Sequence, residues 1–204
     1  EATGGRLHIA HVSTRGALDH IRRAKQRGLA VTAEVAIHHL VLTDEAVASY
    51  DPNLKVNPPL RSAEDVEALR AALADGTIDC LVSDHAPHAP EEKEVEFALA
   101  PFGLIGLETT LPLLVTKLIE PGVLDWPRAI AAMTCGPARA LGIKAGTLEA
   151  GRPADVTLID PEAEWTIDAA AFRSKSRNCP FHGWRVKGRA AVTIVGGDVK
   201  YDTR

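Results

Sequence analysis

Side chains that can bind a metal ion or move a proton follow three apolar segments of this sequence. Imidazole nitrogens and carboxylate oxygens are ligands suited to Zn²⁺, and a catalytic zinc site keeps one position open for water. A metal held in this way polarises a carbonyl group and brings the pKa of water close to neutrality. The residue types therefore indicate metal-assisted hydrolysis, provided that the segments end at one place in the fold. The residues concerned are His11, His38, His39 and Asp84.

The segments that carry these residues alternate with helical patterns. Residues 6–12, 29–37 and 78–82 are rich in apolar and β-branched side chains, which predicts strands. Between them, residues 15–28 and 63–75 place apolar side chains along one helical face. This alternation predicts a parallel sheet. In a (β/α) barrel the carboxyl ends of the strands share one face, so we expect the four residues to converge there.

The pattern changes after Gly151. Short segments of alternating polar and apolar residues follow, and this predicts an antiparallel β extension. The segments are 154–161, 164–167, 184–188 and 190–203. We therefore expect a partial α/β barrel over residues 1–147 and a small β-rich domain over residues 148–204.

Composition excludes several classes of protein. The chain has 204 residues, of which 46% are hydrophobic and 25% charged, as is usual for a globular domain. A formal net charge of -4 and an aromatic content of 4% argue against a nucleic-acid partner. The three cysteines form no C-x-x-C pair, which indicates a reducing, cytoplasmic setting. No apolar run is long enough to span a bilayer, so we expect no membrane partner.

Each feature also has a purely structural interpretation. By strand alternation His8 lies on the face opposite to His11, and we interpret it as a structural residue. One of the two consecutive histidines after the second strand has the same interpretation. The motif around Asp84 alone predicts a turn, and the charged run 91–96 predicts a solvated loop. The functional interpretation rests on three strand ends that all carry such groups.

Six motifs, in order along the chain, resemble the second half of a dihydroorotase of the bacterial type I branch of the amidohydrolase superfamily. The motifs are LHIAHVST, EVAIHHL, KVNPPLR, SDHAPH, APFGLIGLET and NCPFHGWRVKGR. The resemblance extends from residue 6 to about residue 201. It implies the last part of a TIM barrel followed by a small β domain. It also implies zinc-dependent, reversible hydrolysis of L-dihydroorotate to N-carbamoyl-L-aspartate in pyrimidine biosynthesis.

The resemblance implies roles for particular residues. His11 corresponds to a zinc ligand at the end of the sixth barrel strand, and Asp84 to the ligand at the end of the eighth. In the family this aspartate is also the general base, which takes a proton from the metal-bridged water and passes it to the leaving amide nitrogen. We interpret His85 as a residue that supports the site. The residues implied in substrate binding are Asn57, His88, Phe102 and Gly103, the last two through their backbone.

Other parts of the family's site have no counterpart in these 204 residues. They are the paired histidines H-x-H of the first strand, the bridging carboxylate, the histidine of the fifth strand and the arginine that binds the substrate carboxylate. A complete barrel takes roughly 250 residues, and three strands are evident here. We therefore expect a C-terminal portion of a longer enzyme that binds two Zn²⁺ per full-length subunit, and we expect this chain alone to be inactive.

Two other functions stay open at this point. Hydantoinases and allantoinases are cyclic amidohydrolases of the same superfamily with the same layout. A dihydroorotase-like subunit without activity can instead support the assembly of aspartate transcarbamoylase, although such relatives tend to lose metal ligands. For the active enzyme, we expect a small-molecule substrate and a homo-oligomer, with aspartate transcarbamoylase as a candidate partner.

Overall fold

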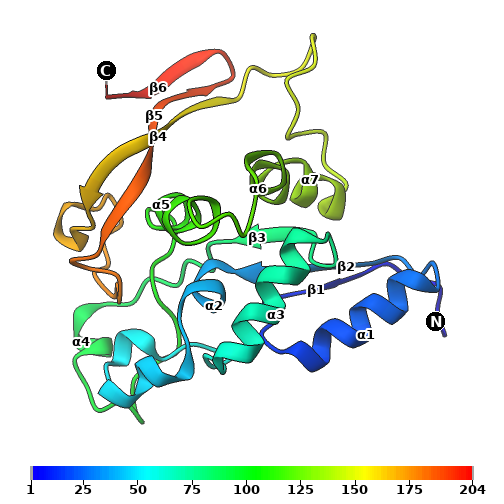
Figure 1. The fold of residues 1–204 in the computed structure, drawn as a ribbon. Helices are drawn as coiled ribbons and strands as arrows, with labels where there is room; N and C mark the ends of the chain where they lie inside the picture. Colours follow the sequence, from blue (N-terminus) through cyan, green and yellow to red (C-terminus); the bar gives the residue numbers. More distant parts are fainter. Residues whose placement is uncertain (1, 204) are drawn as a thin grey trace.

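The computed structural model of the protein describes residues 2–203, and its first sheet is parallel. Strands β1 (Leu7–Ile9), β2 (Val31–Ala36) and β3 (Cys80–Val82) pair in the order β1-β2-β3 (Figure 1). Both pairings are parallel, and Glu34 lies opposite Cys80 in the second of them. The α/β architecture predicted from the sequence is confirmed. The three parallel strands make up a part of a barrel. The strands are shorter than the apolar segments that predicted them.

Helices α1 (Arg15–Gln26) and α3 (Ala63–Ala74) connect the three strands. Each begins at a side-chain cap, because the hydroxyl groups of Thr14 and Ser62 accept hydrogen bonds from amides of the first turn. Shorter helices lie in the loops that follow β2 and β3. They are α2 (Ile37–Val41), η1 (Asp44–Ser49), η2 (Pro52–Leu54) and α4 (Pro90–Lys93).

The remaining helices are α5 (Thr110–Leu114), which continues into a π-helical turn η3 (Val115–Ile119), then α6 (Trp126–Met133) and α7 (Cys135–Leu141). Helix α5 begins at Thr110, where the amide donates to the carbonyl of Gly106 at 2.9 Å. Helix α5 lies between the first sheet and the second (Figure 1). Within residues 2–203, no helix is long and apolar enough to cross a membrane.

The second sheet is antiparallel. It contains β4 (Val156–Thr166), β5 (Arg185–Val195) and β6 (Asp198–Asp202), and the 3₁₀ turn η4 (Ala169–Ala171) follows β4. Two of the expected strands are one strand, β4, whose pairing with β5 shifts register between Asp160 and Glu164. A bulge of this kind keeps two segments in one strand, and the sequence alone predicted a break there.

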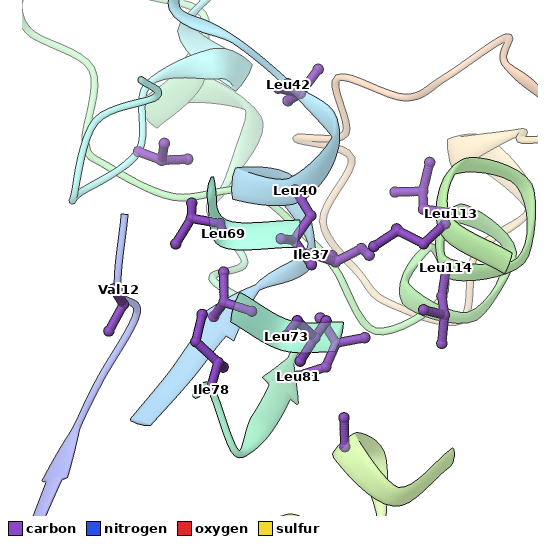
Figure 2. Close-up of a cluster of buried hydrophobic side chains, with 14 of the residues drawn as sticks. Val12, Ile37, Leu40, Leu42, Leu69, Leu73, Ile78, Leu81, Leu113 and Leu114 are labelled. Atoms are coloured by element: carbon purple, nitrogen blue, oxygen red, sulfur yellow. The ribbon is translucent and has the colours of Figure 1, made fainter. Parts of the chain in front are cut away.

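One hydrophobic core joins the two sheets. Figure 2 shows Ile37 and Leu40 from α2 together with Leu113 and Leu114 from α5, all of them fully buried. The same cluster includes Phe181, which precedes β5 and is 0% exposed. Residues on both sides of the expected domain boundary therefore pack into a single core, and the C-terminal segment is held against the barrel portion.

Candidate functional site

The carboxyl ends of β1 and β3 carry two residues in a strained backbone conformation. His11 has a φ of 37° and Asp84 a φ of 46°. Within residues 2–203, only Tyr50 shares a positive φ among the non-glycine residues. Such a conformation costs on the order of 1–3 kcal/mol and persists where the surrounding structure enforces it, commonly at functional sites. The two residues implied as metal ligands are thus also two of the three backbone outliers.

His38 and His39, the two histidines after β2, lie on the first turn of α2. Both are buried, with less than 3% of their surface exposed. His39 Nε2 is 2.9 Å from the carbonyl oxygen of Pro58, a hydrogen bond that anchors the loop that contains Asn57. His38 has no hydrogen-bond partner at either ring nitrogen within the described chain. Its Nε2 lies 3.8 Å from Asp84 Oδ2, so the imidazole is directed at the carboxylate.

Burial determines the charge state of His38. It lowers the pKa of the imidazole well below its ordinary value of 6.5, and the nearby charges of His39 and His11 lower it further. Burial also lowers the pKa of His39. The His38 ring is therefore neutral at pH 7, and its approach to Asp84 is not an ion pair. A neutral, buried imidazole with free nitrogens can donate to a carboxylate or coordinate a cation.

The substrate residues implied by the resemblance lie on three segments of the chain, which backbone groups connect. His88 Nε2 is 2.9 Å from the carbonyl oxygen of Phe102, and the amide of Gly103 donates to the carbonyl of Lys55 at 2.8 Å. Asn57 is exposed in the loop that Lys55 enters. The structure thus links the segments of His88, Phe102 and Gly103 to the segment that leads to Asn57.

Gly103 has to be a glycine for two reasons. Its φ is 125°, which side-chain-bearing residues rarely adopt, and a Cβ at this position would lie 2.4 Å from the Cβ of Ala86. The loop that contains Phe102 therefore approaches the SDHAPH turn at backbone distance. His85 contributes to the same junction, because its Nδ1 accepts a hydrogen bond from the amide of Gly106 at 3.2 Å.

The expectation that residues 91–96 form a solvated loop is wrong for Lys93, which is 7% exposed. Its ammonium group donates to the carbonyls of Pro52 at 2.9 Å and Pro101 at 2.8 Å. Burial lowers its pKa. The apolar stem of a lysine packs well, and two carbonyl groups here replace the water that the head would bind. A single lysine among glutamates gave no pattern from which this contact could be predicted.

A second residue without a sequence pattern is Asn178, which is 4% exposed and contacts the turn at His88. It belongs to the motif NCPFHGWRVKGR. This motif contributed to the family resemblance, but it did not predict a role for Asn178. Asn178 and His88 line a small cavity of about 120 Å³. A groove of about 660 Å³ lies between α5 and the second sheet, and its lining includes none of the implied site residues.

The donor set agrees in type, but not in number, with the metal that the resemblance implies. The chemistry fits, because His11 and Asp84 supply an imidazole and a carboxylate at the ends of two strands of one sheet. The number of ligands is too small, since no group of three or more His, Cys, Asp and Glu side chains in residues 2–203 is arranged to hold a metal ion. These residues therefore match part of a zinc site.

Comparison with known proteins identifies the family. The model of the amidohydrolase family matches residues 2–200. The chain belongs to the amidohydrolase family. This amidohydrolase sequence is 58% identical to a dihydroorotase of Syntrophotalea carbinolica over 201 residues, which are 98% of the chain. It is also 58% identical to a dihydroorotase of Pelotomaculum thermopropionicum over 204 residues.

Solved amidohydrolase structures have the same fold. An L-hydantoinase (dihydropyrimidinase) from Arthrobacter aurescens superposes with a TM-score of 0.94 at 35% identity, over 98% of this chain and 46% of that one. A D-hydantoinase from a Thermus species superposes with a TM-score of 0.89 at 29% identity. The chain spans about half the length of the curated relatives that it matches, 47% and 48% of the two dihydroorotases. This coverage agrees with the expected partial barrel.

Proposed function

We propose that this chain is part of a zinc-dependent dihydroorotase, which interconverts L-dihydroorotate and N-carbamoyl-L-aspartate. The observation that carries the proposal is the position of His11 and Asp84, both with positive φ, at the carboxyl ends of two strands of one parallel sheet. Identities of 58% to two curated dihydroorotases support the choice of substrate. Retention of His11, Asn57, Asp84 and His88 supports an active enzyme over a non-catalytic subunit.

In this proposal Asp84 is the general base. Its side chain is 36% exposed and lies where a substrate can reach it, while His38 limits its movement from the buried side. A carboxylate in this position accepts a proton from the attacking water and returns it to the amide nitrogen that leaves the ring. The groups proposed to bind the substrate are the side chains of Asn57 and His88 and the backbone at Phe102 and Gly103.

His11 and Asp84 would hold zinc together with ligands from outside this chain. When bound, zinc polarises an amide carbonyl and favours ionisation of water. The chain's own contribution is to hold His11 and Asp84, both in a strained conformation, at the carboxyl ends of β1 and β3. The amide of Val12, which donates to the carbonyl of Glu34 at 2.9 Å, attaches the backbone next to His11 to β2.

The test is a competition among substrates. The full-length polypeptide that contains this sequence is incubated with dihydroorotate, hydantoin and allantoin, and kcat/KM is measured for each. We expect dihydroorotate to have the highest value. A higher value for hydantoin would support the second candidate, a hydantoinase, which the TM-score of 0.94 to an L-hydantoinase favours. No turnover of any of the three in zinc-loaded protein would favour the non-catalytic subunit.

Further proposals concern the surroundings of the enzyme. We propose a cytoplasmic homo-oligomer, with aspartate transcarbamoylase as a candidate partner, since consecutive enzymes of one pathway gain from association. Sedimentation of the full-length protein with and without that enzyme tests both. We also propose the domain boundary at residues 147 and 148, where a run of exposed residues without helix or strand separates α7 from β4. Limited proteolysis that cuts within 142–155 would support it.

A further inference from the structure

The side chain of Asn178 connects the two segments that carry the proposed substrate-binding groups. Its Nδ2 donates to the carbonyl oxygens of Ala86 at 2.9 Å and Gly103 at 3.2 Å. Its Oδ1 accepts a hydrogen bond from the amide of His88 at 3.4 Å. Both amide protons and the oxygen of one carboxamide are therefore in use, and the residue is only 4% exposed.

The backbone of Asn178 extends the same junction. Its carbonyl oxygen accepts a hydrogen bond from the amide of Ile105 at 3.1 Å. The segment from Ala86 to His88 and the segment from Phe102 to Ile105 are irregular, and the bridge between His85 and Leu104 is isolated from the named strands. Few ladder hydrogen bonds hold these segments in place. A residue far along the chain supplies the contacts that a longer strand pair would otherwise provide.

The contacts of Asn178 fall on the turns that carry the groups proposed to bind the substrate. The imidazole of His88 is bonded to the carbonyl of Phe102, and the amide of Gly103 is bonded to Lys55. Asn178 adds further hydrogen bonds to the same two turns. Displacement of either turn would move His88 relative to Gly103, and it would weaken binding of the substrate in the ground state and in the transition state alike.

We propose that Asn178 is a positioning residue that sets the distance between His88 and the backbone of Gly103 in the substrate site. This inference rests on the proposed function, because it assigns a substrate-binding role to both segments. The proposal gives Asn178 no contact with the reacting atoms, so it acts through the residues that it holds. An aspartate at this position has the same shape, but it lacks both donors and would place an unpaired charge beside two carbonyl oxygens.

The test is a pair of matched variants in the full-length zinc-loaded polypeptide. In Asn178→Asp the two donors are lost. In the control Asn53→Ser, an asparagine that lines the same cavity of about 120 Å³ is changed without adding a charge, and its side chain makes no hydrogen bond to either turn. We expect KM for dihydroorotate to rise at least about tenfold in Asn178→Asp with kcat within about threefold of wild type, because ground-state and transition-state binding are lost together. We expect the control to match wild type.

Three results overturn the proposal: an unchanged KM in a folded Asn178→Asp protein, an equal rise in KM in the control, or a loss confined to kcat. If Asn178→Asp does not fold, Asn178→Ser is measured by the same criterion, because its hydroxyl group retains one donor. Wild-type turnover separates this proposal from the proposed function. If wild type prefers another cyclic amide, the function proposed above fails. The KM of Asn178→Asp is then compared with that of wild type for the preferred substrate, and this comparison tests the role of Asn178.

Discussion

The imidazole of His38 is directed at the carboxylate of Asp84 from the buried side of the site, with 3.8 Å between Nε2 and Oδ2. Neither ring nitrogen of His38 has a hydrogen-bond partner in the described chain, although the residue is 0% exposed. An unsatisfied buried donor costs about 1–3 kcal/mol. The fold retains this destabilising, unsatisfied imidazole next to the strained Asp84. We therefore infer that His38 has a role in the site and not only in core packing.

Replacement of His38 by leucine separates these two roles. His38→Leu removes the polar nitrogens at similar volume, so we expect the metal-free protein to unfold at the same temperature as wild type or a few degrees higher. We expect kcat/KM to fall at least about tenfold, because Asp84 loses a neighbour that limits its orientation. Thermal unfolding in chelator and steady-state kinetics measure the two effects. A lower unfolding temperature with unchanged kinetics would assign His38 to the core alone.

The proposed general base can be removed with little change in shape. Asp84→Asn retains a residue type that tolerates the φ of 46° at this position. We expect kcat to fall at least about 100-fold in the full-length enzyme, because the proton acceptor is lost, while circular dichroism is unchanged. The matched control is Asp19→Asn on the exposed surface of α1. Residual activity above a few percent of wild type would argue strongly against Asp84 as the base.

The ligand assignment of His11 has a readout that does not depend on turnover. We expect His11→Ala to lower zinc affinity at least about tenfold, since loss of residues that only support a ligand already costs 10- to 100-fold. Zinc per polypeptide after dialysis, measured by atomic absorption, shows the change. His20→Ala, on the exposed surface of α1, is the control and should keep the wild-type zinc content. An unchanged zinc content in His11→Ala would contradict the assignment.

The thiol of Cys80 makes stability depend on pH. Burial, followed by the charge of Asp79, raises its pKa from 9.0 to about 11. Between these values the unfolded chain releases the proton and the folded chain retains it, so the free energy of unfolding falls as pH rises. At 1.36 kcal/mol per unit, the loss approaches about 3 kcal/mol. Urea unfolding from pH 8 to pH 11 should show it, and Cys80→Ala should lose that part of the slope. An identical slope in both proteins would refute the prediction.

The sequence predicted the elements of the barrel portion because their information is local. Apolar runs gave the three strands, and the capping hydroxyls of Thr14 and Ser62 stand where α1 and α3 begin. The resemblance named His11 and Asp84, and parallel pairing then required both to lie at one edge of the sheet. Local patterns did not predict features that depend on the pairing of strands. Strand β4 continues through a bulge where the sequence predicted a break.

Tertiary structure alone decided which polar side chains the site uses. His38 and His39 are adjacent and identical in type, and only packing leaves one directed at Asp84 and bonds the other to Pro58. Asn178 reaches Ala86 across 92 positions of sequence, and no periodicity encodes a contact of that range. The residue types and the helical and strand periods are fixed by the sequence itself. The partners of a buried polar group depend on which segments the whole fold brings within hydrogen-bond distance.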